Sequence, residues 1–336
     1  MIATADPQGT VSQPSRILCA GLAVLALEAY RSLGGREHSG DVGIAAAMLS
    51  LLTKIDDQVI DSASFHGGMG RESEEVAKRV RARLAPTLES IRTGIPATSE
   101  PRCLLAAELG YRLQVMSGSQ ERLEHLVSVI SMGWEIQARG VSTLSRHPGS
   151  VSGRRVARAS ADISGAWLLM ITLVGTLPPD TTRSLRSCEE DSFFEWGQYI
   201  QQADALADLD KDTRDGLVCT VPGHYAYRQD PDSFLSAVAD RDSDSLYALY
   251  ADTGADLACL PSSDRRHELL APLADLGQIG PILEWIHGFL LWRYLQHPQC
   301  RRVVSHQLVR PLLNDPHGWR SFVSDCAKEE VSCSVL

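Results

Sequence analysis

Two groups of aspartates are spaced so that their carboxylates could hold a metal ion together. In the first group Asp57 and Asp61 are four residues apart, and Asp56 stands beside them. Side chains four apart leave the same face of a helix, where like charges repel unless a cation bridges them. The nearly apolar run at 42–55 favours a core helix that carries these acids into a cavity. A solvated, frayed helix end is the alternative interpretation.

The second group consists of aspartates at a constant spacing. Asp204, Asp208 and Asp212 recur every four residues, and Gln201 lies three residues before the first of them. Each four-residue step advances about 400° around a helix, so the three aspartates stay within roughly 80° of one another. An all-oxygen stripe of this kind suits Mg²⁺, which takes one or two carboxylates plus substrate phosphate oxygens. The alternative is an exposed acidic face, but the nearby basic residues do not lie on the stripe.

Two acid-rich helices in one apolar chain predict a particular chemistry. Ions held between the helices would bind a diphosphate, draw electron density into it and let it depart, leaving a carbocation in an apolar pocket. The acids would then bind metal and would not transfer protons. The expected metal ligands are Asp56, Asp57, Asp61, Asp204, Asp208 and Asp212.

The elements that must position these acids are helices. Apolar residues recur at three and four positions along long segments, Gly and Pro pairs separate the segments, and no stretch of similar length alternates as a strand would. We therefore expect an all-α fold: a single large helical bundle over 17–325 with a central apolar active-site cavity, a disordered arm at 1–16 and a flexible tail at 326–336. The expected helices are 16–33, 41–63, 73–92, 100–116, 119–140, 154–177, 182–212, 231–250, 265–276, 280–296 and 306–313.

The composition of the chain argues against nucleic acid as a partner and against a cysteine metal site or disulfide scaffold. The chain of 336 residues has 42 acidic and 32 basic side chains, a net charge of −10, which argues against nucleic acid as a partner. Its eight cysteines show no CxxC pair and no His at metal spacing. They are expected to be free and buried in a reducing cytoplasm, where we expect the protein to be located.

No targeting or membrane segment is evident. The first sixteen residues lack a basic start and a cleavage pattern, and the apolar stretches 17–27 and 163–177 are shorter than the roughly 18 residues that a membrane span needs. Stable membrane insertion is not expected, whereas peripheral contact is left open. The last four residues, Cys333-Ser334-Val335-Leu336, match the C-a-a-X prenylation pattern, but no polybasic stretch precedes them, which favours a chance match.

The second aspartate group resembles a motif of the squalene/phytoene synthase branch of the class I isoprenoid synthases, written G-x₃-Q-x₂-N-x₃-D-x₂-E-D-x₃-G. Asp57 and Asp61 resemble the D-x₃-D of its first motif, and residues 163–175 resemble its apolar V-A-G-x-V-G-x-M helix. All positions of the second motif but Asp204 and Lys211 are identical to the pattern; in this chain they are Gly197, Gln201, Asp204, Asp208, Lys211, Asp212 and Gly216.

The departures from the family pattern bear on the reaction. Asp204 stands in place of Asn and keeps an oxygen ligand, whereas Lys211 replaces a Glu and loses one. The G-R-x-Y-L-P segment expected after Gly216 is missing, with one extra residue before Pro222, and 28–31 is the nearest match to the S-F-Y segment. These absences weaken head-to-head condensation of two prenyl diphosphates but not ionisation of one.

The resemblance implies a cofactor and roles for single residues. The cofactor would be Mg²⁺, about three ions per site, with Mn²⁺ as a substitute. Asp57, Asp61 and Asp208 would be catalytic through the metal, and Gln201 would support the ligands from behind. Diphosphate would be held by basic residues near the acids and by an Arg-Tyr pair such as terpene cyclases carry: Lys54, Arg214, Arg293 and Tyr294. An Arg snorkelling from a core helix is the alternative for Arg293.

Aromatic side chains could stabilise a cation in the cavity, although each could equally be plain core. We expect one or two of five to face it: Trp134, Trp167, Trp196, Phe289 and Trp292.

The leading hypothesis is a Mg²⁺-dependent terpene synthase that ionises a linear C15 or C20 prenyl diphosphate, cyclises the carbocation and releases diphosphate. Head-to-head condensation and prenyl transfer to a non-prenyl acceptor are the alternatives within the same fold. A non-catalytic prenyl-binding or scaffold protein is the alternative from another class. Substrate chain length, product skeleton and assembly into a homodimer are left open.

Overall fold

The computed structural model describes residues 13–65, 73–257 and 260–298. This part of the chain forms thirteen α-helices and contains no strand, so the all-α expectation is confirmed. The helices are α2 Gln13–Ser32, α3 Ser39–Phe65, α4 Ser73–Thr93, α5 Pro101–Met116, α6 Gln120–Leu144, α7 Gly153–Val174, α8 Ser187–Ala207, α9 Leu209–Asp215, α10 Val221–Gln229, α11 Pro231–Ala239, α12 Ser243–Thr253, α13 Ser263–Leu270 and α14 Ile279–Tyr294. Short 3₁₀ turns lie at Pro148–Ser150 and Ala271–Leu273.

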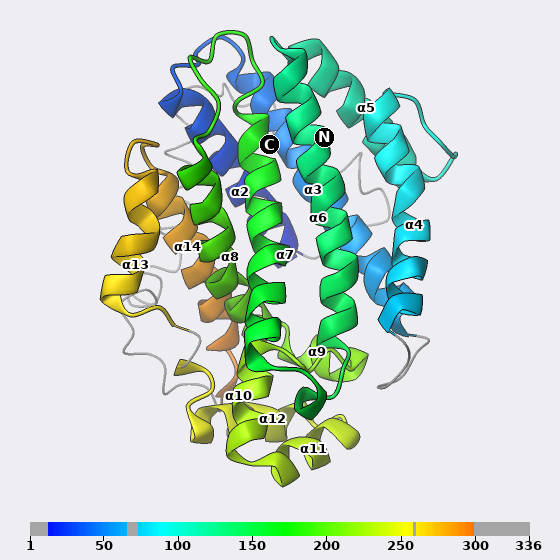
Figure 1. The fold of residues 1–336 in the computed structure, drawn as a ribbon, viewed down its shortest axis with the longest axis vertical. Helices are drawn as coiled ribbons and strands as arrows, with labels where there is room; N and C mark the ends of the chain where they lie inside the picture. The colour runs from blue at the N-terminus through cyan, green and yellow to red at the C-terminus, as the bar shows by residue number, and fades with distance from the viewer. Residues whose placement is uncertain (1–12, 66–72, 258–259, 299–336) are drawn as a thin grey trace.

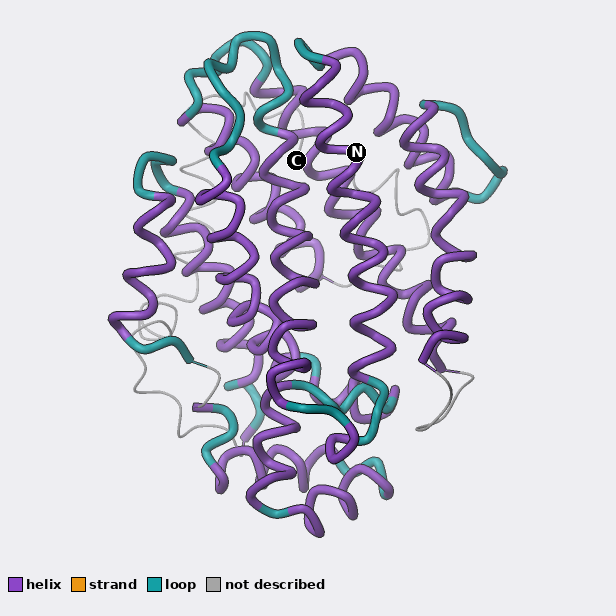
Figure 2. The backbone as a smooth tube through the Cα atoms, in the orientation of Figure 1, coloured by secondary structure: helices purple, strands orange, loops and turns teal. Residues whose placement is uncertain are grey.

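The long helices run along the long axis of the molecule, with α7 central and in contact with α2, α6 and α8 (Figure 1). Loops collect at the two ends of the bundle, as Figure 2 shows. At one end Gly118 N donates to Leu177 O over 2.9 Å, which joins the loops before α6 and after α7. At the other end Cys219 N donates to Leu144 O over 3.1 Å, so that the turn from α9 to α10 lies against the end of α6.

Local signals explain where the central helices begin and end. Ser119 caps α6 by accepting from Arg122 N, and Ser152 caps α7 by accepting from Arg155 N, which satisfies amides that no helical carbonyl can reach. Helix α9 ends at Gly216, whose φ of 71° is in the left-handed region that favours glycine. The chain can therefore turn sharply from α9 into α10.

Helices α7 and α8 touch backbone to backbone. A Cβ atom on Gly197 would lie 2.2 Å from Gly165 N, and one on Gly165 would lie 2.3 Å from the Cα of Phe194. No larger residue fits at either position without moving a helix. The two glycines thereby bring Ser164 of α7 and Gln201 of α8 within 2.6 Å of each other.

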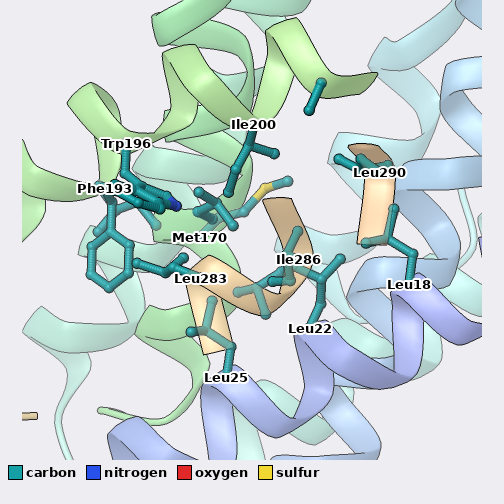
Figure 3. Packing of buried hydrophobic residues seen from close by; sticks show 14 of the residues in the cluster. Leu18, Leu22, Leu25, Met170, Phe193, Trp196, Ile200, Leu283, Ile286 and Leu290 are labelled. Carbon is teal, nitrogen blue, oxygen red and sulfur yellow. The ribbon is translucent and has the colours of Figure 1, made fainter. Parts of the chain in front are cut away.

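Helix α14 packs between α2 and α8 and is held by apolar contacts. Figure 3 shows Leu22 and Leu25 of α2 and Trp196 of α8 around Leu283 and Ile286 of α14, all with no exposed surface. Burial of side chains of this size stabilises a fold by about 1.5–3 kcal/mol each. The last turn of α14 is therefore anchored where it approaches α8.

Some expected helices are in fact two helices. The prediction misses the break between them because the apolar spacing continues from one helix into the next. The expected helix 182–212 is two helices, α8 and α9, that meet at Asp208. The expected helix 231–250 is also two, because Asp242 begins α12 by accepting from Ser245 N. Helix α10 was not expected, and α2 begins at Gln13, inside the segment expected to be a disordered arm. The expected helix 306–313 and the final four residues lie outside the described residues.

Helix α7 is longer than its apolar stretch suggested. It spans 22 residues, and among the described residues it is the one helix long and apolar enough to cross a membrane. Within its most apolar window 67% of the residues are buried in the bundle, as they are in the core helix of a soluble protein.

The described cysteines are free, as the absence of paired spacing indicated. Cys19, Cys103 and Cys219 are buried, whereas Cys188 is exposed in the first turn of α8. The expectation of burial is therefore wrong for Cys188.

Candidate functional site

A cavity of two adjoining chambers lies among the central helices. Asp57, Gln137, Ile163, Gln201 and Asp204 line both chambers. The apolar chamber is completed by Thr53, Lys54, Gly133, Trp134, Ser164, Trp167, Met170, Ile200 and Leu290. The polar chamber is completed by Val141, Leu144, Ser160, Gln202, Ala205, Asp208, Lys211, Asp212, Leu217, Thr220 and Val221.

Asp57 of the first aspartate group and all three members of the second line this cavity. Asp57 is on α3. Asp204 is on α8, Asp212 is on α9, and Asp208 is the residue between those two helices. Asp208 N donates to Asp204 O over 2.8 Å, and Asp212 N donates to Asp208 O over 2.9 Å. Because the four-residue bonding continues across the junction of α8 and α9, the second stripe stays on one side and faces the polar chamber.

Asp57 is held by two neighbours. Gln137 Nε2 of α6 donates to its Oδ1 over 2.9 Å, and Lys54 Nζ lies 3.6 Å from its Oδ2. Lys54 also lies 5.3 Å from the ring centre of Trp167, within cation–π range. Burial by itself would lower the pKa of Lys54, but Asp57, Asp204 and Asp208 raise it above its usual value. The ammonium group therefore stays charged.

Asp208 and Asp204 occupy different electrostatic settings. Arg293 Nη2 of α14 donates to Asp208 Oδ1 over 2.7 Å. Burial and the charge of Asp208 raise the pKa of Asp204 to about 6, although Lys54 and Arg293 oppose the shift. Burial is the larger of the two causes, so the carboxyl group of Asp204 is poorly solvated where it lines both chambers.

Three glutamines line the polar chamber, and two of them, Gln201 and Gln202, are on α8 with Asp204. Gln201 Oε1 accepts from Ser164 Oγ over 2.6 Å, so its amide is fixed against α7. Gln202 is only 2% exposed, and its Oε1 has no hydrogen-bond partner among the described residues. A buried acceptor without a donor is costly, so this atom indicates a ligand or water in the chamber.

The donor set fits a hard divalent cation that shares its ligands with a substrate. Carboxylate and amide oxygens surround the polar chamber, and the raised pKa of Asp204 marks charge that a cation would relieve. No three His, Cys, Asp or Glu side chains in the described part of the chain converge as a closed protein cage would require. Because Mg²⁺ keeps one or two protein carboxylates and completes its shell with water and phosphate oxygens, such a cage is not needed.

Four of the predicted site residues whose side chains are described line neither chamber: Asp56, Arg214, Tyr294 and Arg293, of which Arg293 bonds to the lining residue Asp208. Asp56 is buried on the other side of α3, where Arg102 Nη1 of α5 lies 3.6 Å from its Oδ1. Burial raises the pKa of Asp56 to about 7, and Arg102 opposes the shift. Arg214 is exposed and its Nε donates to Asp210 O, while Tyr294 is buried against the ring of Tyr247. Asp61 lies in α3, but its side chain is outside the described residues.

The aromatic candidates divide between cavity and core. Trp134 and Trp167 line the apolar chamber. Trp196 is fully buried in the core, and Phe289 stacks on Trp292 with ring centres 6.0 Å apart; none of these three lines either chamber.

The structure adds site residues that sequence reasoning missed. Gln137 and Ser164 contact the predicted residues Asp57 and Gln201. One signal could have located Gln137: the spacing Gly133-x₃-Gln137 on α6 matches the spacing Gly197-x₃-Gln201 on α8, and both glutamines line both chambers.

Comparison of the chain with protein-family models, curated proteins and solved structures finds no match. The resemblance to the isoprenoid synthases therefore depends on the motif residues and on the site they form.

Proposed function

We propose that this chain is a Mg²⁺-dependent class I isoprenoid synthase. It ionises a linear C15 or C20 prenyl diphosphate, cyclises the carbocation and releases diphosphate. The observation that carries the proposal is the convergence of Asp57 of α3 with Asp204, Asp208 and Asp212 on one cavity that continues into an apolar chamber. The acids of the polar chamber suit an anionic head group that brings cations, and the apolar chamber lies where the hydrocarbon chain would begin. Its volume of about 70 Å³ is smaller than a C15 chain, so the helices around it would have to move apart to admit the whole substrate.

The residues of the polar chamber would bind the head group and its cations. Asp57, Asp204, Asp208 and Asp212 would hold Mg²⁺, which when bound neutralises and polarises the diphosphate. Lys54, which lines the apolar chamber, and Arg293 of α14, which lies beside the polar chamber, would donate hydrogen bonds to diphosphate oxygens. Lys54 is already 3.6 Å from Asp57 on its own helix, and Arg293 is 2.7 Å from Asp208.

The residues of the apolar chamber would control the carbon chain. When the bond between C1 and the diphosphate oxygen breaks, its electron pair leaves with the oxygen and a cation remains on carbon. Trp134 and Trp167 would offer aromatic faces to that cation, and Met170, Ile200 and Leu290 would exclude water from it. A double bond of the same chain then closes the ring by donating its π electrons, which leaves the positive charge on another carbon. Loss of a proton from the neighbouring carbon to the departed diphosphate would give a neutral cyclic olefin.

Release of diphosphate is the direct test. Purified protein incubated with Mg²⁺ and C10, C15 or C20 prenyl diphosphate should release diphosphate and form a product from a single substrate. Asp57→Ala and Asp208→Ala should each reduce this release at least about a hundredfold, because each removes a cation ligand. Unchanged release by both variants would show that the metal assignment is wrong.

The product separates the alternatives within the same fold. Two substrates joined into one hydrocarbon would indicate head-to-head condensation. Release that begins after a non-prenyl acceptor is added would indicate prenyl transfer.

A non-catalytic prenyl-binding protein is a second candidate, favoured by one observation. Lys211 lines the polar chamber at the position where the family motif has an acid, which reduces the number of cation ligands. Recovery of intact prenyl diphosphate after long incubation with Mg²⁺ would favour this function. A helical scaffold would instead show no Mg²⁺-dependent ligand binding in calorimetry.

A further inference from the structure

Gln137 connects a third helix to the first aspartate group. It is on α6, it lines both chambers, and its Nε2 donates to Asp57 Oδ1 over 2.9 Å. Lys54 Nζ is farther from the same carboxylate, at 3.6 Å from Oδ2. The two oxygens of Asp57 therefore have different surroundings: Oδ1 accepts a hydrogen bond from an amide, and Oδ2 faces the ammonium group of Lys54.

The packing of α6 on α7 fixes where Gln137 lies. Gly133 precedes it by four residues and Gly140 follows it by three, so all three are on one face of α6. A Cβ on Gly140 would lie 2.2 Å from Ile163 Cδ1, and one on Gly133 would lie 3.6 Å from the Cβ of Ala166. Small residues on both sides of Gln137 let α6 approach α7 closely and hold the amide at the mouth of both chambers.

We propose that Gln137 is a positioning residue that fixes the carboxylate of Asp57 for cation binding, an inference that rests on the proposed function. By holding Oδ1, the amide fixes the plane of the carboxylate, with Oδ2 beside Lys54 in the chamber that both residues line. Without the amide the carboxylate could rotate and bring both of its oxygens to Lys54, which would then compete with a cation for them. Outer-shell hydrogen bonds to carboxylate ligands commonly change metal affinity tenfold or more.

The arrangement has a counterpart on the opposite wall of the cavity. There Ser164 of α7 donates to Gln201, and Gln201 lies one turn before Asp204. Each aspartate group is therefore flanked by a glutamine that follows a glycine by four residues and that packs against α7. Gln137 donates its hydrogen bond directly to Asp57. Any effect of Gln137 on cation affinity should therefore act through Asp57 alone.

A double-mutant cycle tests this transmission. Mn²⁺ binding in the presence of inorganic pyrophosphate is measured by electron paramagnetic resonance for the full chain, for Gln137→Met, for Asp57→Asn and for the double variant. Methionine keeps the length of glutamine and removes the amide, so packing is little changed. Gln120→Met, at an exposed position at the start of the same helix, is the matched control. Thermal unfolding of every variant reports whether it folds.

We expect Gln137→Met to weaken Mn²⁺ affinity about tenfold, the double variant to bind no more weakly than Asp57→Asn, and Gln120→Met to match the unmodified chain. Additive effects in the double variant, or unchanged affinity in Gln137→Met, would overturn the proposal. If Gln137→Met does not fold, Gln137→Asn, which keeps the amide and shortens its reach, replaces it with the same expectations.

The measurement separates this inference from the proposed function. The expected binding pattern without turnover of any prenyl diphosphate would leave Gln137 a positioning residue and refute the synthase. Turnover combined with normal Mn²⁺ affinity in Gln137→Met would leave the synthase and refute the role of Gln137. An unmodified chain that binds no Mn²⁺ in the presence of pyrophosphate would refute both.

Discussion

At the scale of single residues, the bases of the cavity are already paired with the acids that would bind metal. Arg293 is 2.7 Å from Asp208 Oδ1, and Lys54 is 3.6 Å from Asp57 Oδ2. Each base offsets charge that a divalent cation would otherwise offset. Arrival of a cation with an anionic ligand would let the bases exchange the carboxylate for the anion, so Arg293 and Lys54 should contribute most when both are present.

Substitution of Arg293 tests this exchange. Arg293→Gln should reduce diphosphate release from a prenyl diphosphate at least about tenfold, because it removes a charge-assisted hydrogen bond, typically about 1.5–3 kcal/mol. Arg214→Gln is the matched control. Neither arginine lines a chamber, but Arg293 bonds to the lining residue Asp208, whereas Arg214 is exposed and bonds to a main-chain carbonyl, so release should change less than about twofold. Equal losses in a steady-state release assay would contradict this assignment.

Spacing along one helix predicted some site residues and missed others for a definable reason. Asp204, Asp208 and Asp212 share a face, and the structure places all three at one chamber. Asp56 follows the same apolar run but points about 100° away from Asp57, toward α5. Gln137 acts across a helix pair, and nothing in its own neighbourhood in the sequence indicates that α3 lies opposite.

At the scale of elements, the contact between α7 and α8 at Gly165 and Gly197, here called the seam, brings polar side chains of the two helices together. Gly165 and Gly197 allow the two backbones to touch, which puts Ser164 against Gln201 and aligns Asp204 with the cavity. The motif glycine is therefore a packing residue. It contributes to the site by allowing two helices to approach each other.

A methyl group in this seam should be enough to destabilise the fold. Gly197→Ala should lower the free energy of unfolding by about 1–3 kcal/mol, because its Cβ would lie 2.2 Å from Gly165 N. Gly40→Ala is the control, since a Cβ at Gly40, in the first turn of α3, meets nothing within 4 Å. Its effect should be neutral or stabilising by up to about 1 kcal/mol. Urea unfolding followed by circular dichroism measures both, and equal effects would argue against the seam.

At the end of the bundle opposite α10–α12, one carboxylate accepts three of the hydrogen bonds that join the loops. Asp180 Oδ2, in the loop between α7 and α8, accepts from Tyr30 Oη over 2.6 Å and from Arg36 N and Glu37 N over 2.8 and 3.0 Å. Burial by itself would raise the pKa of Asp180, but these three hydrogen bonds lower it to about 2. The loop after α2 and the loop after α7 are thereby joined.

This depressed pKa predicts a dependence of stability on pH. The unfolded chain binds a proton at Asp180 near its ordinary pKa of about 3.9, whereas the folded chain does so near 2. The stabilisation is complete above about pH 5 and is lost as pH falls toward 2, by about 1–2 kcal/mol after allowance for solvent screening. Asp180→Asn should show less of this loss in urea unfolding at pH 7, 5 and 3. Asp191→Asn, at an exposed site on α8, should keep it, and identical profiles would contradict the prediction.

The presence of a helix could be predicted from the sequence more reliably than the residues at which the helix begins and ends. The apolar period that predicts a helix over 182–212 continues through Asp208, because the four-residue bonding there is kept although the backbone changes direction. The break between α11 and α12 depends on a cap at Asp242, and apolar spacing matches on both sides of it. Periodicity reports which residues share a face; it does not report where a capped turn interrupts them.

At the scale of the whole molecule, part of the acidic surplus behind the net charge of −10 lies in the cavity. A surplus of acids on the surface would keep anions away, yet the polar chamber contains four aspartates on the inside of the bundle: Asp57, Asp204, Asp208 and Asp212. They come from α3 on one side and from α8 and α9 on the other, so repulsion across the cavity acts to separate the helices that the core holds together. A ligand that neutralises these acids should therefore tighten the whole bundle.

Ligand-dependent melting makes this coupling measurable. Mg²⁺ and inorganic pyrophosphate together, at about a hundred times the dissociation constant, should stabilise the fold by about 2.7 kcal/mol, which for 336 residues corresponds to a rise of roughly 4 °C in melting temperature. Pyrophosphate alone should do much less, because the acids repel an anion that brings no cation, and Asp208→Asn should lose most of the rise. Differential scanning fluorimetry with and without a chelator measures all four conditions. A rise that pyrophosphate produces without Mg²⁺, or that Asp208→Asn retains in full, would place the ligand away from these carboxylates, because a cation bridging the anion to Asp208 cannot give either result.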